Sequence, residues 1–219
     1  MILGLIQSKT KLNKEWFSIA LILTMHVFGA VVIGGNLIDN FVLLTPFNLL
    51  MSLGILFWNE NDKNIHLLVV SVLAFVVGLG MEIIGTNTGL IFGEYAYGRT
   101  LGFQVGHVPL IIGANWLMLV YATAAVVNSI AEKQHFIIKA ALSAGLMVFL
   151  DFFIEPVAMQ YDFWSWANDY IPIQNYVAWF VIAFVLLVVT HRILLIKSKT
   201  AIALFIAQLL FFVSLNIIG

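Results

Sequence analysis

The sequence contains no cysteine, and only 10% of its 219 residues are charged. Without cysteine, the chain can form no disulfide, no thiolate metal site and no thiol nucleophile. A soluble domain carries about 25% charged residues, so a chain with so few cannot cover its own surface in water. Because hydrophobic residues make up 62% of the chain, the composition predicts an integral membrane protein.

The motifs of several other chemistries are also missing. The five histidines are scattered along the chain, whereas membrane di-iron enzymes cluster theirs as metal ligands. The last apolar segment has no lysine that could hold retinal, and the chain has no G-x-S-x-G nucleophile turn and no phosphate-binding glycine loop. No basic tract is present, so we expect no nucleic-acid partner. Because the histidines are scattered and cysteine is absent, we also expect no metal site.

Seven apolar segments are long enough to cross a bilayer, since a spanning helix needs about 20 residues. We therefore expect an all-α bundle of about seven spans, and residues 1–219 form a single integral membrane domain in this interpretation. Pro46 is expected to kink the second span. The predicted spans are 16–35, 41–58, 65–85, 108–130, 136–158, 173–195 and 201–218.

The placement of the basic residues predicts the orientation of these spans. Lysine and arginine favour the cytoplasmic side of a membrane. With seven spans, one side collects nine basic residues and the other side has only Arg99, so we expect a cytoplasmic N-terminus and a multi-pass protein of the inner (plasma) membrane. The nine are Lys9, Lys11, Lys14, Lys63, Lys133, Lys139, Arg192, Lys197 and Lys199.

Polar residues of the predicted spans gather in the half of the bilayer away from the cytoplasm. Ionisable groups inside spans are costly and mark candidate functional sites. Asp151 and Glu155 are four residues apart and share a helix face, and Glu82 lies near the outer end of the third span. They predict a cavity that opens from the non-cytoplasmic side. Two other interpretations remain open at this point: carboxylates that only reach interfacial water, and an ion pair between Glu82 and Arg99.

Two long loops belong to the same side. The segment 82–110 holds six glycines, which permit tight turns and close approach of the backbone to a ligand. It is too apolar for a solvated loop, so we expect it to fold back over the bundle. The segment 161–176 is rich in tryptophan and tyrosine, which suit the headgroup level or the wall of a pocket. His26, in the middle of the first span, is interpreted as a packed or hydrogen-bonded side chain.

Several sequence blocks in this outer half resemble the membrane carotenoid biosynthesis protein family, which includes carotenoid 1′,2′-hydratases and bisanhydrobacterioruberin hydratases. The blocks are E-I-I-G-T-N-T-G-L-I-F-G-E-Y-A-Y-G (82–98), G-H-V-P-L-I-I-G-A-N-W (106–116), D-F-F-I-E-P-V-A (151–158), D-F-W-S-W (162–166) and I-P-I-Q-N-Y-V-A-W-F (171–180). Family members often have L-D-P where this chain has I-E-P at 154–156, a change that keeps the carboxylate but extends it by one methylene.

The resemblance implies hydration of the terminal 1,2 double bond of a carotenoid ψ end group, which gives a tertiary alcohol. A carboxylic acid protonates the alkene, and water adds to the tertiary cation. The reaction is redox-neutral, so no cofactor is expected. Candidate catalytic residues are Asp151, Glu82, Glu155 and Glu94, and candidate substrate-binding or water-orienting residues are Asn87, Asn115, Asn175, Tyr95, Trp116, Trp164 and Trp166.

Two other functions fit the same residues. An end-group cyclase or isomerase would share the protonation step but exclude water, and a carotenoid carrier would bind the polyene without changing it. The expected partners are a carotenoid, water and the lipid bilayer, with other enzymes of the carotenoid pathway as further candidates.

Overall fold

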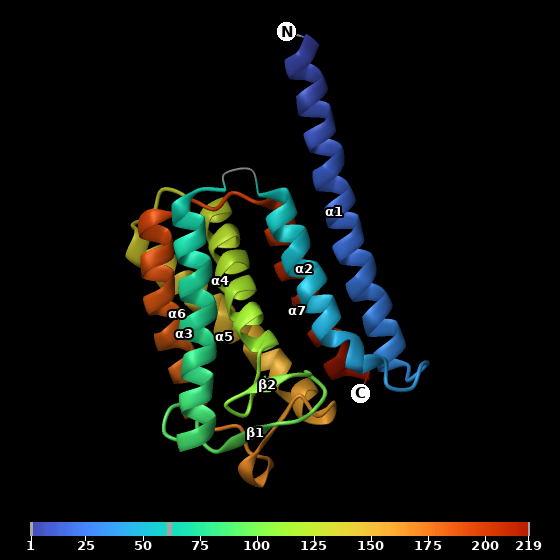
Figure 1. Ribbon diagram of the computed structural model, residues 1–219, viewed down its shortest axis with the longest axis vertical. Helices are drawn as coiled ribbons and strands as arrows, with labels where there is room; N and C mark the ends of the chain where they lie inside the picture. The colour runs from blue at the N-terminus through green and yellow to red at the C-terminus, as the bar shows by residue number, and fades with distance from the viewer. Residues whose placement is uncertain (1, 61–62, 219) are drawn as a thin grey trace.

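The computed structural model is an all-α bundle of membrane-spanning length (Figure 1). It describes residues 2–60 and 63–218, with side chains from residue 13 onward, so those of Lys9 and Lys11 lie outside the described part. Within that part, seven helices are long and apolar enough to cross a membrane. They are α1 (Ile2–Gly34), α2 (Thr45–Asn59), α3 (Ile65–Thr88), α4 (Ile111–Ile130), α5 (Phe136–Gln160), α6 (Ile173–Ile193) and α7 (Lys199–Ile218). The second span also includes the short 3₁₀ helix before α2 and runs over Phe41–Asn59.

The helix α4 is the centre of the bundle, since it packs against α2, α3, α5, α6 and α7. It is the most enclosed of the seven, because 89% of its apolar stretch is buried inside the protein. Figure 1 shows α3 and α6 on one side of α4, and α1, α2 and α7 on the other. Helix α5 packs against both α6 and α7, so it joins the two helix groups beside the buried α4.

The predicted spans agree with the structure to within three residues at each end, counted over the apolar part of each helix. Local sequence explains several ends. Asn64 caps α3, because its side chain accepts a hydrogen bond from the Leu67 backbone N–H at 3.0 Å. The same helix stops at Gly89, whose φ of 67° is favourable only for glycine.

The first span is found where it was expected, at Asn13–Gly34, although helix α1 itself extends back to Ile2. One detail differs from the sequence prediction. Pro46 does not kink the second span: it lies in the first turn of α2, directly after a short 3₁₀ helix (Phe41–Leu44). A proline is tolerated in the first turn because no backbone donor is needed there.

The two long loops meet at the end of the bundle opposite the N-terminus, called here the outer end. Strand β1 (Tyr95–Tyr97) from the first loop pairs antiparallel with β4 (Trp164–Trp166) from the second. A second small ribbon joins β2 (Gln104–Val105) to β3 (Val108–Pro109), and a 3₁₀ turn (Ala167–Asp169) follows β4. The glycine-rich loop thus folds back over the bundle as expected, and it does so as strands (Figure 1).

Glycine is required at two close contacts, one between the two long loops and one between α3 and α4. A Cβ on Gly98 would lie 2.1 Å from the Asp162 carbonyl oxygen, where the two long loops touch. A Cβ on Gly78 would lie 2.3 Å from Cγ of the Trp116 ring, where α3 meets α4. Both distances are too short for any side chain, so these glycines allow the loops and helices to pack at their observed separation.

Candidate active site

Glu82 of α3 is buried, with 2% of its surface exposed, and receives three hydrogen bonds. Its Oε2 accepts from the phenol groups of Tyr95 at 2.6 Å and Tyr97 at 2.9 Å. Its Oε1 accepts from the indole Nε1 of Trp116 at 3.1 Å. Hydrogen-bond donors of this kind stabilise an ionised carboxylate in a place that water does not reach.

Glu155 of α5 is equally buried and also receives three donors. Its Oε2 accepts from the indole nitrogens of Trp164 at 2.8 Å and Trp166 at 2.7 Å. Its Oε1 accepts from the side-chain amide of Asn175 in α6 at 2.8 Å. Glu82 and Glu155 therefore have matching surroundings, each with aromatic donors on one oxygen and one further donor on the other.

Asp151 differs from both glutamates, because it receives one long hydrogen bond. The Asn175 amide, which binds Glu155, also lies 3.3 Å from Asp151 Oδ2. Asp151 is 2% exposed and lies one helical turn before Glu155 on the same face of α5. No ion pair to any of the three carboxyl groups is found among the described residues.

The ribbon of β1 and β4 delivers four of the aromatic donors. Tyr95 lies opposite Trp166, and Tyr97 lies opposite Trp164. Side chains alternate along a strand, so these four rings share the face toward the bundle while Ala96 and Ser165 are exposed on the other face. The ribbon covers the carboxyl groups from the outer end.

The two tyrosines of β1 are held in their neutral form. Burial, followed by the charge of Glu82, raises the pKa of the Tyr95 phenol and of the Tyr97 phenol above the usual value for tyrosine. A phenol that stays protonated remains a hydrogen-bond donor, so the Glu82 interactions persist throughout the neutral pH range.

A small cavity lies between the carboxyl groups. Its free volume is about 20 Å³, enough for about one water molecule. Asn115 of α4 lines it, as does Trp179 of α6, which stacks on Trp116 with ring centroids 4.2 Å apart. The other lining residues are Glu82, Tyr95, Tyr97, Ile112, Asp151, Ile154, Glu155, Trp164, Trp166 and Asn175.

Eight of the eleven residues predicted from the sequence line this cavity. Trp116 lies behind it and reaches the site through its bond to Glu82, whereas Glu94 and Asn87 do not belong to the site. The Glu94 side chain is exposed at the edge of β1, and only its backbone carbonyl is used, as acceptor for the Ala167 N–H. Asn87 holds the loop instead: its amide donates to the carbonyls of Ile83 and Gly106. The Glu82–Arg99 ion pair is also not formed, since tyrosine and tryptophan donors occupy the Glu82 oxygens.

Tyr97 and Trp179 belong to the site but were not predicted from the sequence. Tyr97 is two residues after Tyr95, so a strand assignment for 95–97 would have placed both phenols on one face. Trp179 is four residues after Asn175 in α6, the same spacing that placed Asp151 beside Glu155.

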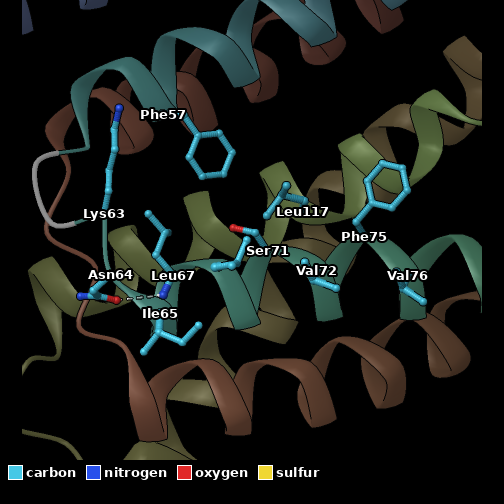
Figure 2. Close-up of a pocket in the computed structure, with 11 residues that line it drawn as sticks. Phe57, Lys63, Asn64, Ile65, Leu67, Ser71, Val72, Phe75, Val76 and Leu117 are labelled. Carbon is cyan, nitrogen blue, oxygen red and sulfur yellow. Dashed lines mark hydrogen bonds between the residues drawn. The ribbon is translucent and has the colours of Figure 1, made fainter.

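A separate groove opens sideways between α2 and α3, toward the end where the chain begins (Figure 2). It encloses about 680 Å³, with Phe57 on one wall, Leu117 of α4 on its floor and Lys63 at its mouth. Figure 2 shows the Ser71 side chain between Phe57 and Leu117. This groove shares no lining residue with the acidic cavity.

Comparison with known proteins gives one match. A family model described as carotenoid biosynthesis protein matches residues 40–218, which include every residue of the acidic cavity. A search of curated proteins and a search of solved structures returned no match. The matched region covers α2 to α7 and leaves out α1.

Proposed function

Since the chain belongs to the carotenoid biosynthesis protein family, we propose that it is a hydratase that adds water to the terminal 1,2 double bond of a carotenoid ψ end group. One observation carries the proposal: three carboxyl groups surround a water-sized cavity, and their hydrogen bonds are unequal. Glu82 and Glu155 each receive three donors, whereas Asp151 receives one at 3.3 Å. With such unequal hydrogen bonding, one carboxyl group can act as the proton donor while the other two stay ionised and stabilise positive charge.

Asp151 is the proton donor in this proposal. Glu82 and Glu155 beside it already carry negative charge and accept three hydrogen bonds each. A third negative charge in the same water-excluded site is unfavourable, so Asp151 holds a proton. The proton passes to the less substituted alkene carbon, and the electron pair of the double bond forms the new C–H bond. General acid catalysis of this kind contributes about 10²–10⁴-fold in rate.

The tertiary cation that results lies next to the two ionised glutamates. Their negative charges stabilise it, and the faces of Trp164 and Trp179, which line the cavity, add cation–π attraction. Aromatic rings alone contribute about 2 kcal/mol when the cation is desolvated. The fixed charges need no rearrangement when the cation forms, which is the usual basis of electrostatic catalysis.

Water completes the reaction at the tertiary carbon. Asn115 lines the cavity, and the Asn175 amide joins Asp151 to Glu155, so both amides are placed to orient the attacking water. The oxygen forms a bond to the cation and releases one proton to a carboxylate, from which Asp151 is reloaded. The net change is the addition of one water, with no electron transfer.

We place the protein in the plasma membrane with its N-terminus in the cytoplasm, so the acidic cavity opens on the opposite side. The unequal distribution of lysine and arginine supports this orientation. The polyene reaches the protein from the bilayer in this proposal, because a long hydrocarbon is concentrated there.

Product masses test the proposal directly. The chain is expressed in a host that accumulates lycopene, and pigments are separated and weighed by mass spectrometry. A hydratase adds the mass of one water at each reacting end. A cyclase or isomerase leaves the mass unchanged but shifts retention, and a carrier changes neither; either result overturns the assignment.

A further inference from the structure

A second cavity, on the other side of α4, has features of a ligand site. It encloses about 230 Å³ between α1, α2 and α7, and shares no lining residue with the acidic cavity. Four of its lining side chains are polar: His26, Thr45, Asn48 and Gln208. The remaining walls are mostly aromatic and aliphatic, with rings from Phe28, Phe41, Phe47, Phe211 and Phe212.

Gln208 is the first reason to assign a ligand to this cavity. The residue is 4% exposed, and its Oε1 is buried with no hydrogen-bond partner among the described residues. Buried side-chain acceptors are normally paired, because leaving one unpaired costs about 1–3 kcal/mol. The Gln208 side chain lines the cavity, so rotation of its amide would turn this unpaired oxygen toward a donor that enters the cavity.

His26 supplies a second acceptor in the same place. Its Nδ1 lies 2.9 Å from the Ile22 carbonyl oxygen, which can only accept, so Nδ1 carries the proton. In the neutral imidazole the Nε2 is then an acceptor, and no partner for it is found among the described residues. His26 is 6% exposed and lines the cavity together with Gln208. The residues that line the cavity therefore carry two hydrogen-bond acceptors without donors, one on α1 and one on α7.

The chemistry of the cavity selects a neutral, mostly apolar ligand that carries a donor. No charged side chain is present among the described lining residues, so a charged ligand would be buried without a counter-charge. A hydroxyl group fits this chemistry, because its one proton can be donated to either His26 or Gln208 while the hydrocarbon part of the ligand contacts the phenylalanine rings.

A neighbouring hollow provides room for a hydrocarbon tail. It encloses about 370 Å³ along α1 and α7 and is lined mainly by aliphatic residues such as Leu23, Val27 and Leu210. His26 and Phe211 line both hollows, so these side chains lie between the two spaces. A ligand that contacts His26 therefore has apolar walls beside it in either hollow.

We propose that this is a second ligand site, which binds the hydroxyl group of a long or branched membrane alcohol. Two sources share that chemistry: a hydroxylated polyene, such as the product of the proposed reaction, and a rigid ring alcohol of the sterol type. The assignment does not depend on hydration, because it rests on groups outside the acidic cavity.

Binding measurements with matched probes test the site. The full chain is placed in phosphatidylcholine nanodiscs, and radiolabelled isophytol, a branched tertiary alcohol, is competed with cholesterol or with phytane, the corresponding saturated hydrocarbon. We expect isophytol to bind at least tenfold more tightly than phytane, the ratio that corresponds to one good hydrogen bond. Tighter binding of isophytol indicates a hydroxylated polyene as the ligand, and tighter binding of cholesterol indicates a ring alcohol of the sterol type.

Variants separate this site from the acidic one. Gln208→Leu keeps the bulk of the side chain and removes an unpaired buried acceptor, so it is expected to fold and to weaken isophytol binding about tenfold. Asp151→Asn is expected to leave that binding unchanged, even where it abolishes turnover. Asn216→Leu is the control on the same helix, because Asn216 lines neither hollow and its amide donates to the Phe153 and Phe212 carbonyls.

Photolabelling provides a readout that needs no variant. An isophytol analogue with a diazirine near its hydroxyl is expected to label peptides that contain Met25–Gly29 of α1 or Gln208–Phe212 of α7. Equal affinity for isophytol and phytane, unchanged binding in Gln208→Leu, or labelling confined to other helices would each overturn the proposal.

Discussion

Tyr97 and Trp164 face each other across the ribbon of β1 and β4, yet they donate to different carboxylates. Tyr97 binds Glu82 of α3, and Trp164 binds Glu155 of α5. One pair of strands therefore ties two distant helices to a common cover.

Asp151→Asn is expected to lower the rate of hydration at least about 100-fold, since the variant keeps the shape of the side chain but has no acidic proton. Product formation is measured by chromatography in lycopene-accumulating cells, at matched protein levels. Asp169→Asn is the control: it makes the same chemical change at an exposed residue of the outer end. Full activity in Asp151→Asn would exclude this residue as the proton donor.

Glu155→Gln is expected to destabilise the protein by about 1–3 kcal/mol, because an amide nitrogen would replace an oxygen that now accepts hydrogen bonds from buried donors. Thermal unfolding in one detergent gives the shift. Glu94→Gln is the matched control, since the Glu94 side chain is exposed and lies outside the cavity. Equal unfolding temperatures for the two variants would contradict the hydrogen bonding described for Glu155.

Gly78→Ala is expected to disturb the site from a distance. The new Cβ would lie 2.3 Å from the Trp116 ring, so the ring must shift and its bond to Glu82 is strained. Overpacking of this kind costs about 1–3 kcal/mol, and we expect lower activity as well. Gly80→Ala in the same helix meets no atom within 4 Å and is expected to be neutral or stabilising. Similar effects of the two changes would rule out the packing explanation.

The phenols of Tyr95 and Tyr97 predict a loss of stability at high pH. Their pKa is raised in the folded protein, mainly by burial, so their contribution is complete below about pH 10, the usual tyrosine value, and is lost as the pH rises toward the folded pKa. Unfolding temperatures are compared at about pH 9 and pH 11 for the native chain and the Tyr95→Phe/Tyr97→Phe variant. The native chain should lose more over this range; parallel losses would contradict the prediction.

A cysteine pair across the ribbon tests how the substrate enters. The cavity has about 20 Å³ of free volume, so its cover must move before a carotenoid end group can occupy it. Ala96 and Ser165 are opposite each other and exposed, and the chain has no other cysteine to interfere. Ala96→Cys/Ser165→Cys is expected to lose activity on oxidation and regain it on reduction. Full activity in the oxidised form would instead favour entry between helices, for example from the groove between α2 and α3.

The helices were predictable because each depends on a local property of the sequence. Apolar length fixes a span, and the spacing of four residues places Asp151 and Glu155 on one face whatever surrounds them. The Asn175 donor comes from α6, but the aromatic donors to Glu155 and the phenol donors to Glu82 depend on a contact between two loops that are far apart in the sequence. Tyr97 could not be assigned from the glycine-rich loop alone, because its role follows from the register between β1 and β4.

Glu94 is the converse case: the sequence predicts it as a site residue, but the structure places it outside the cavity. A carboxylate beside Tyr95 was a reasonable candidate while the loop had no assigned structure. Once residues 95–97 form a strand, alternation turns Tyr95 and Tyr97 inward, and Glu94 lies exposed at the strand's edge. The strand is stabilised by its pairing with β4, which no local pattern in the first loop encodes.

The order of the Glu82 partners along the chain has a consequence for biosynthesis. Glu82 emerges from the ribosome before Tyr95, Tyr97 and Trp116, and β4 follows only after two more helices. Helix α3 must therefore insert while its carboxylate has no donors. Glu82 is six residues from the end of that helix, about 9 Å from the interface, where it can still reach water. A chain that stops before β4 leaves Glu155 without any of its three donors, and it leaves β1, which carries two of the Glu82 donors, without its paired strand.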